Sequence, residues 1–238
     1  MSEADPTPWK WLLYGRYMAL ALTFTRGLTP DELLERYGAD TGAARPLPYI
    51  DIDAALHQDN EHAVLRVGVL GEWAFGIEDC GVQGAAPATL AELSRGTETI
   101  SVNSGENAFE VFEYWVDGMP REQFEPGMAS TLKAAGPHPF WDVAERHRAA
   151  RPDIQNILAV MRTVEDHIGA RLPKETDDGP LPSLLLRQVR PMLPSPAPPL
   201  PRVNPPARAS TGRAGLGRSL GPLRLPGDKS RERNTHSE

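Results

Sequence analysis

The chain has a single cysteine, Cys80, among its 238 residues. An intrachain disulfide needs two cysteines and an all-cysteine zinc site needs four, so both are excluded. Such cysteine usage is typical of a reducing compartment and indicates a cytoplasmic location. Because the carboxylates of Glu78 and Asp79 precede Cys80 and disfavour its thiolate, we expect an inert cysteine at the end of a strand.

Long apolar runs are also absent. The most apolar stretch, residues 11–24, is interrupted by Gly15 and Arg16, whereas a membrane-spanning helix needs about 20 consecutive apolar residues. A signal peptide is not predicted either, since Glu3 and Asp5 occupy the part that should be basic. The sequence therefore predicts no membrane span.

Motifs for catalysis and cofactor binding are absent as well. The chain has no phosphate-binding loop, no dinucleotide-binding glycine fingerprint and no serine elbow. One short segment combines acidic residues with histidines and is the candidate for a metal site: Asp51, Asp53, His57, Asp59, Glu61 and His62. Its spacing matches no fixed-geometry site, so a solvated connector is the favoured interpretation. No catalytic, cofactor-binding or metal-binding residue is assigned.

Charge is present but unevenly distributed. Residues 1–190 contain 17 Lys and Arg against 29 Asp and Glu, a net charge of −12, which argues against nucleic acid as a partner of this part. Residues 191–238 contain 8 against 3, with ten of the 24 prolines. Proline lacks a backbone donor and fixes φ, so the sequence predicts one folded domain at 1–190 and a disordered Pro/Arg-rich tail at 191–238. Docking of residues 198–202 in an aromatic groove is the alternative for the tail.

Apolar residues that alternate with polar ones predict five strands, at 63–70, 73–78, 97–103, 108–116 and around 121–125. Gly71-Glu72 and Asp117-Gly118 are typical hairpin turns, the former of type II′. Since short connections join antiparallel neighbours, we expect a five-stranded antiparallel meander.

Helical spacing predicts helices on both sides of these strands in the sequence. Residues 9–26 carry two apolar rows, which indicate a mostly buried helix. Thr29 and Glu32 can form a capping box at the start of a second helix, and Thr89 and Glu92 repeat this pattern. Further helices are predicted at 139–149 and 154–168, with His147 and His167 on solvated faces. The sequence thus predicts an α+β fold in which N-terminal and C-terminal helices pack on the sheet.

Several of these runs together resemble a known family. They are LALTFTRGLTPDELL at 20–34, GEWAFGIE at 71–78, LSRGTE at 93–98, and DG at 117–118 followed by FEP at 124–126. Over roughly residues 10–185 the combination resembles an uncharacterised actinobacterial family, number 6461 among the domains of unknown function. The resemblance implies a small α+β domain of the bacterial cytoplasm and offers no catalytic residue to carry over. The proline-rich tail lies outside it.

A non-enzymatic intracellular protein-binding domain, with an immunity-like or regulatory role, is the leading hypothesis for function. Such a domain would recognise another protein through the sheet or its acidic rim. Strand parity places Phe109, Val111 and Trp115 on one face of the fourth strand and Phe112, Tyr114 and Val116 on the other. An aromatic patch is exposed if helices cover only one face of the sheet, and none is exposed if helices cover both.

The alternative is a small-ligand binder or an enzyme whose site forms only in three dimensions. A deep pocket that contains two or more of five polar residues would favour this alternative. These residues are Arg66, Glu78, Glu110, Glu113 and Asp117.

Overall fold

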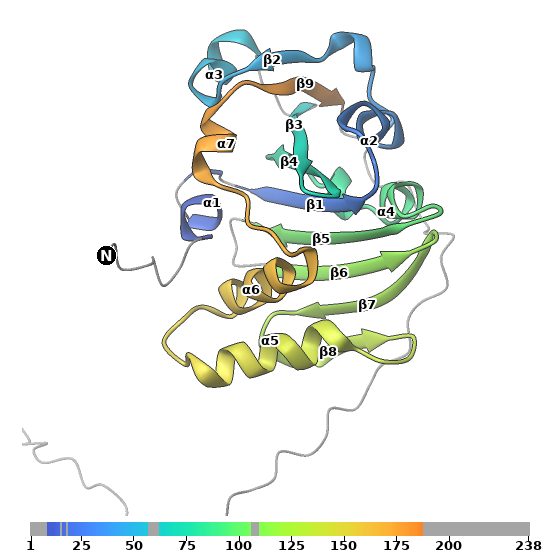
Figure 1. Cartoon of the computed structure of the whole chain (residues 1–238), viewed down its shortest axis with the longest axis vertical. Coiled ribbons are helices and arrows are strands. Elements are labelled where there is room, and N and C mark those ends of the chain that lie inside the picture. The colour runs from blue at the N-terminus through green and yellow to red at the C-terminus, as the bar shows by residue number, and fades with distance from the viewer. Residues whose placement is uncertain (1–8, 15, 18, 57–61, 106–109, 188–238) are drawn as a thin grey trace, which may run out of the picture. The chain divides into compact units, whose positions relative to one another are not determined.

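In this computed structural model, helices lie on both faces of an antiparallel sheet (Figure 1). The structure describes residues 9–14, 16, 17, 19–56, 62–105 and 110–187. The strands are β1 Leu20–Arg26, β2 Arg45–Leu47, β3 His62–Leu70, β4 Trp73–Asp79, β5 Glu98–Ser104, β6 Glu110–Val116, β7 Met119–Glu125, β8 Met128–Ala134 and β9 Leu181–Arg187. Their order is β2-β9-β3-β4-β1-β5-β6-β7-β8, and every neighbouring pair is antiparallel. The predicted α+β class is confirmed, but the sheet has nine strands among the described residues rather than five.

The helices are α1 Lys10–Tyr14, α2 Pro30–Arg36, α3 Ile52–Ala55, α4 Pro87–Leu93, α5 Pro139–Ala150, α6 Asn156–Ile168 and α7 Lys174–Asp178, with single 3₁₀ turns η1 Thr41–Ala43, η2 Tyr49–Asp51 and η3 Gln83–Ala85. The capping box predicted for α2 is confirmed, because Thr29 and Glu32 each accept the backbone N–H of the other through their side chains. The box predicted at Thr89 is wrong. Helix α4 begins at Pro87, whose fixed φ suits the first helical position, so Thr89 lies inside the helix.

All five predicted strands are present, as β3 to β7. The turn between β3 and β4 has a positive φ of 64° at Gly71, and that between β6 and β7 has 51° at Asp117 and 74° at Gly118. Positive φ at the first central residue alone fits type II′, and positive φ at both fits type I′. The two tight hairpins are therefore confirmed. Residues 108 and 109, at the predicted start of the fourth strand, lie outside the described residues.

The predicted helix over 9–26 is wrong for its second half, because Leu20–Arg26 is the central strand β1 between β4 and β5. Leu22 and Phe24 pack against the face covered by α6, whereas Thr23 lies on the opposite face. Leu20, Leu22 and Phe24 alternate with Ala21, Thr23 and Thr25, as a strand requires, but the same apolar residues also fit two helical rows that continue from residues 9–14.

The predicted meander is interrupted, since β1 separates β4 from β5. Strands β2, β8 and β9 have no counterpart among the predicted strands. β2 has only three residues, one of which is Pro46, and the pairing of β8 with β7 is irregular between Gln123 and Glu125. β9 pairs with β3 from a distant part of the chain, so no turn signal marks it. The predicted tail, 191–238, lies outside the described residues.

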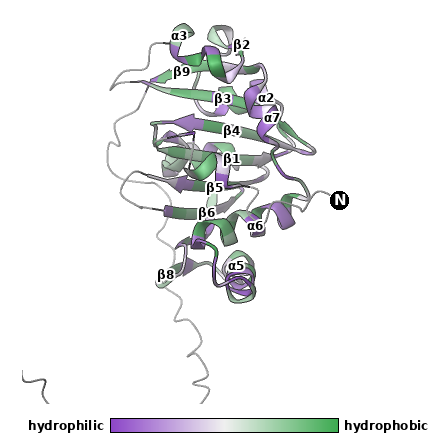
Figure 2. Ribbon diagram, turned by 90° about the vertical axis from the view of Figure 1, so that its left-hand side faces the viewer, coloured by the Kyte–Doolittle hydropathy of each residue, from purple (hydrophilic) through white to green (hydrophobic). Residues whose placement is uncertain are grey.

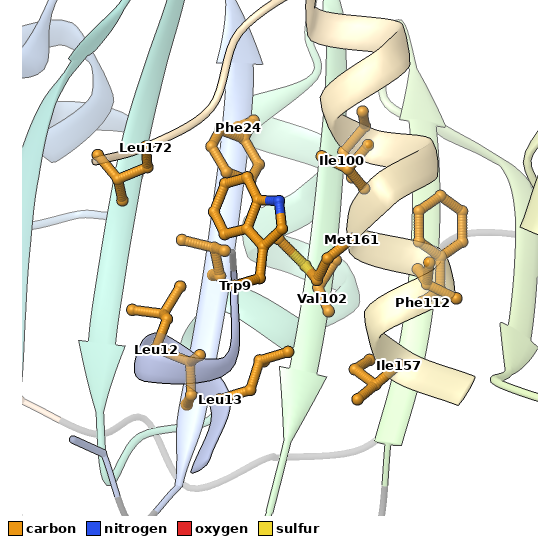
Figure 3. Close-up of a cluster of buried hydrophobic side chains, with 14 of the residues drawn as sticks. Trp9, Leu12, Leu13, Phe24, Ile100, Val102, Phe112, Ile157, Met161 and Leu172 are labelled. Atoms are coloured by element: carbon orange, nitrogen blue, oxygen red, sulfur yellow. The ribbon is translucent and has the colours of Figure 1, made fainter. Parts of the chain in front are cut away.

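Helices bury both faces of the sheet. In Figures 1 and 2, α5 and α6 lie next to each other on one face, and Figure 3 shows Ile157 and Met161 of α6 pointing at the strands. On the other face α2 and α4 cover a second apolar cluster that includes Trp115. Since Phe112 and Trp115 are 0% and 2% exposed, these aromatic side chains of β6 form no binding patch. Of the two sequence-based alternatives, helices on both faces are the correct one.

A buried ion cluster joins the N-terminal part of the chain to α7. Arg66 on β3 is 1% exposed and binds the carboxylate of Asp177, which is 0% exposed. The guanidinium of Arg66 also donates to the carbonyl oxygens of Asp177, Leu47 and Gly179, at 2.8, 3.1 and 3.1 Å. Arg16 binds the same carboxylate, and the Tyr17 hydroxyl donates to it at 2.9 Å. Asp177 therefore pairs with two guanidinium groups, and Asp178, which also binds Arg16, supplies the second negative charge.

We expect Asp177→Asn to destabilise the domain by about 3 to 5 kcal/mol, because it leaves Arg66 as an uncompensated buried charge. Urea unfolding measures this loss. The matched control is Asp178→Asn, since Asp178 also binds Arg16 but is 44% exposed, and its loss should be much smaller. Equal losses for the two variants would contradict a dominant role of the buried pair.

Candidate functional site

The five polar residues proposed to mark a convergent pocket do not meet. Arg66 is bound to Asp177, and Glu78 accepts the N–H groups of Gln83 and Gly84, at 2.9 and 2.6 Å, where η3 begins. Of the five, Asp117 lines a hollow at the ends of the central strands, and the other four do not line this hollow. The residues that do converge are different ones.

The metal candidate is not assembled in the described residues. Among them no three His, Cys, Asp or Glu side chains are grouped so that they could hold a metal ion. Residues 57–61 of the acidic segment lie outside the described part of the chain. In that part, too, no helix is long and apolar enough to cross a membrane.

A polar hollow lies at one end of the central strands, and we call it the strand-end hollow. It has a volume of about 570 Å³ and lies where β1 ends, β5 begins and β6 turns into β7. Its lining residues are Arg26, Gly96, Thr97, Glu98, Tyr114, Val116 and Asp117. Three neighbouring strands and their turns therefore supply one site.

Glu98 is the centre of the hydrogen-bond network in this hollow. Its carboxylate accepts the Tyr114 hydroxyl at 2.7 Å, lies 3.3 Å from Nε2 of His167, and accepts Arg26 at 3.3 Å. A second nitrogen of Arg26 binds Glu72 at 3.1 Å. Glu98 is thus held in one orientation by three side chains from β6, α6 and β1.

The protonation states of this network favour binding over proton transfer. Burial alone would raise the pKa of Glu98, but the hydrogen bonds from Tyr114 and His167 outweigh it, so the pKa lies below the ordinary value. Burial and the carboxylate of Glu98 raise the pKa of Tyr114 well above the ordinary value. Glu98 therefore stays ionised and Tyr114 stays protonated at neutral pH, so neither is poised to exchange a proton there.

The hollow is acidic. Glu98 and Asp117 line it together with one guanidinium, that of Arg26, so the charged lining residues sum to −1, and the exposed carboxylate of Glu72 also binds Arg26. Asp117 is exposed and accepts the backbone N–H of Gly96 at 3.0 Å. Among the described residues no cation pairs with Asp117, so its charge is available to a ligand.

A second, apolar hollow adjoins the first, and we call it the interhelix hollow. It has a volume of about 190 Å³ between α5 and α6, and it is lined by Pro139, Phe140, Val143, Thr163, Asp166 and His167. The ring centroid of His167 is 4.8 Å from that of Phe140 and 6.0 Å from that of Tyr114. Because Tyr114 lines the strand-end hollow, the contact between the rings of His167 and Tyr114 connects the linings of the two hollows.

His167 lies on an exposed face of α6, as predicted, but its ring also makes aromatic contacts. The side chain of His167 packs against aromatic rings, including that of Trp73 at 5.7 Å, and is 35% exposed. His147 does lie at the surface, where it pairs with Asp166 at 2.8 Å. Glu98 lies in LSRGTE, one of the runs that carry the family resemblance. The contact of Arg26 with Glu98 was not predicted, because it requires residues 20–26 to form the strand β1 rather than a helix.

The fold and the site together define an α+β domain, built on one antiparallel sheet, with an acidic hollow at its strand ends. The chain matches DUF6461, a family of unknown function, over residues 8–164 and belongs to that family. No curated protein and no solved structure matches it. The matched span ends within α6, so His167, α7 and β9 lie beyond it.

Buried carboxyl groups position the elements around the site. Glu122 on β7 accepts the N–H groups of Phe140 and Trp141, at 3.2 and 2.7 Å, and so fixes the start of α5 beside the interhelix hollow. Glu113 lies on the opposite face of β6 from Phe112, and its carboxylate accepts Gln123 at 3.2 Å. Burial raises the pKa of Glu113 and of Glu122 to about 7.

These pKa values give the stability a definite pH dependence. Because both carboxyl groups have a higher pKa in the folded than in the unfolded chain, the folded chain binds more protons between about pH 4.5 and pH 7. The free energy of unfolding should therefore rise as the pH is lowered from about 8 to about 5, by up to about 3 kcal/mol for each group. Denaturant titrations at several pH values measure this rise.

Glu122→Gln should reduce this pH dependence, whereas Glu35→Gln, at an exposed position of α2, should leave it unchanged. A stability that stays constant or falls as the pH is lowered over this range would contradict the assignment.

Proposed function

We propose that this domain is a non-enzymatic intracellular binding protein whose strand-end hollow contacts a basic segment of another protein. The observation that carries the proposal is the acidic hollow itself. Glu98 is ionised and fixed, Asp117 is exposed and has no cationic partner among the described residues, and the charged lining residues of the hollow sum to −1. A lysine or arginine side chain is the complementary group.

Charge over the whole domain supports the same partner chemistry. Residues 1–190 carry −12, so they attract cations over a distance of about one Debye length and accelerate encounter with a basic partner. This charge also repels nucleic acid. A basic partner protein fits both the local and the overall electrostatics.

Preorganisation supports binding as well. The carboxylate of Glu98 is oriented before any ligand arrives, because Tyr114 and His167 hold it. The hollow is built from strand ends and tight hairpin turns, which move little, so little conformational entropy is lost when a ligand binds. Tyrosine and arginine, both present in the lining, are residue types enriched at interaction hot spots.

An immunity-like or regulatory role in the bacterial cytoplasm follows from this partner chemistry. A domain that binds a basic surface neutralises it and blocks access to it. The single cysteine supports a reducing compartment as the place of action.

A small-ligand binder is the second candidate, and the size of the hollow favours it. The volume of about 570 Å³ falls within the range of small-molecule sites, roughly 300 to 1,000 Å³. A thermal-shift screen with metals and with metabolites that carry no amine or guanidine group distinguishes the two, because a ligand at 100 times its dissociation constant stabilises the fold by about 2.7 kcal/mol. A shift with one such compound would favour the second candidate.

The proposal is tested by affinity capture from native lysate at low salt with the full chain and with the double variant Glu72→Gln, Asp117→Asn. We expect the full chain to retain a basic protein that the double variant loses, because the variant removes two of the three carboxylates around the hollow. Asparagine tolerates the positive φ at position 117, so the turn should be kept.

Glu35→Gln is the control, since it removes one exposed carboxylate from α2, outside the hollow. Recovery of no stoichiometric partner, or equal recovery with the double variant, would overturn the proposal.

A further inference from the structure

The strand-end hollow already contains one guanidinium, that of Arg26 at the end of β1. Its Nη1 donates to Oε1 of Glu98 at 3.3 Å, and its Nη2 donates to the carboxylate of Glu72 at 3.1 Å. The side chains of Arg26 and Glu72 are 54% and 76% exposed, whereas that of Glu98 is 17% exposed. A cation of the chain itself is therefore bound to the fixed carboxylate of the hollow.

The two oxygens of the Glu98 carboxylate have different partners. Oε2 accepts the Tyr114 hydroxyl at 2.7 Å and lies 3.3 Å from Nε2 of His167, which comes from α6. Oε1 accepts Arg26, whose side chain lines the hollow. Since two groups already bind Oε2, a cationic ligand in the hollow would bind Glu98 at Oε1, where Arg26 is bound.

Release of Arg26 from Glu98 costs little free energy. An ion pair between exposed side chains changes an equilibrium by a factor of no more than about five. Arg26 also keeps its second partner, because Glu72 lies in the turn between β3 and β4 and binds a different nitrogen of the guanidinium. A ligand that takes the place of Arg26 at Glu98 therefore breaks one of two ion pairs.

Glu98 does not need Arg26 in order to keep its orientation. The contacts of Oε2 with Tyr114 and His167 hold the carboxylate on its other side. Without the guanidinium of Arg26, the charged lining residues of the hollow would sum to −2 instead of −1. Arg26 thus weakens the attraction of the hollow for a cation and is not required to shape the acceptor.

We infer that Arg26 is an internal competitor for the strand-end hollow and that a basic side chain of the partner displaces it from Glu98. This inference rests on the proposed function, since it needs a cationic ligand in that hollow. It adds the residue that limits the affinity. A single free cation exchanges one ion pair for another, whereas a basic protein segment brings further charges to the acidic surface. Competition by Arg26 therefore favours a basic protein over a free amine or guanidine.

The test compares the unchanged full chain with Arg26→Met in an amide NMR titration with acetyl-arginine amide. We expect the variant to bind this compound about two- to fivefold more tightly, because the ligand no longer has to break an exposed ion pair. Acetyl-glutamine amide, which has no charge, should bind to neither chain. The side chain of Arg26 is more than half exposed, so the substitution should leave the fold intact.

Arg151→Met is the matched control. Arg151 is 45% exposed and binds an exposed carboxylate, that of Asp153, at 2.8 Å, so the control also removes one charge and one surface ion pair. It follows the last residue of α5, whereas Phe140, near the start of this helix, packs on Tyr114 of the hollow. The affinity of the control for acetyl-arginine amide should therefore change much less than that of Arg26→Met.

A second measurement uses the unchanged chain alone. The side-chain Nε–Hε signal of Arg26 should shift during the titration with the same dissociation constant as the amide signals of Gly96 and Asp117, because release from Glu98 changes the surroundings of the guanidinium. A signal of Arg26 that stays constant while these amide shifts saturate would show that the ligand does not displace it.

The outcomes separate the two claims. Equal or weaker binding by Arg26→Met would overturn the role of Arg26 as a competitor and leave the proposed function standing. An equal gain in Arg151→Met would also overturn that role, because net charge alone would then account for the effect. Saturable binding by neither the unchanged chain nor Arg26→Met would overturn both claims.

Discussion

Strand β1 is the constraint on which the rest of the structure depends. Within the described residues it is the only strand that joins the β2-β9-β3-β4 half of the sheet to the β5-β6-β7-β8 half. Its six residues from Leu20 to Thr25 are buried, with Leu22 and Phe24 in the core under α6. Where β1 ends, Arg26 reaches Glu98 on β5, so the candidate site exists only because this strand is inserted at the centre.

The molecule has two clusters of charged side chains, a buried one around Asp177 and an exposed one at the strand-end hollow. Arg66 and Arg16 share the buried carboxylate of Asp177, Asp178 supplies the second negative charge, and these ion pairs tie α7 to β3. At the strand-end hollow the balance is incomplete, because carboxylates outnumber the one guanidinium. A buried cluster that is balanced holds the fold together, whereas an exposed cluster with unbalanced charge is available to a ligand.

The sequence allowed the five strands β3 to β7, the two hairpins, the cap of α2 and the apolar row of α6 to be predicted, since each depends on residues close together in the chain. β1 was misread because its apolar residues also fit helical rows continuous with residues 9–14, although Leu20, Leu22 and Phe24 alternate with Ala21, Thr23 and Thr25. β9 pairs across a long sequence separation, which leaves no local signal. The site was not predicted for the same reason: the approach of Arg26 and His167 to Glu98 depends on strand order and on the end of α6.

The central claim is that the strand-end hollow binds a cationic side chain, and the most direct measurement is an amide NMR titration of the full chain with acetyl-arginine amide, compared with acetyl-glutamine amide. The account predicts saturable shifts for the arginine compound alone, centred on Gly96, Thr97 and Asp117, which weaken in Asp117→Asn and at high salt. Shifts spread evenly over the acidic surface, or identical shifts with the glutamine compound, would contradict it.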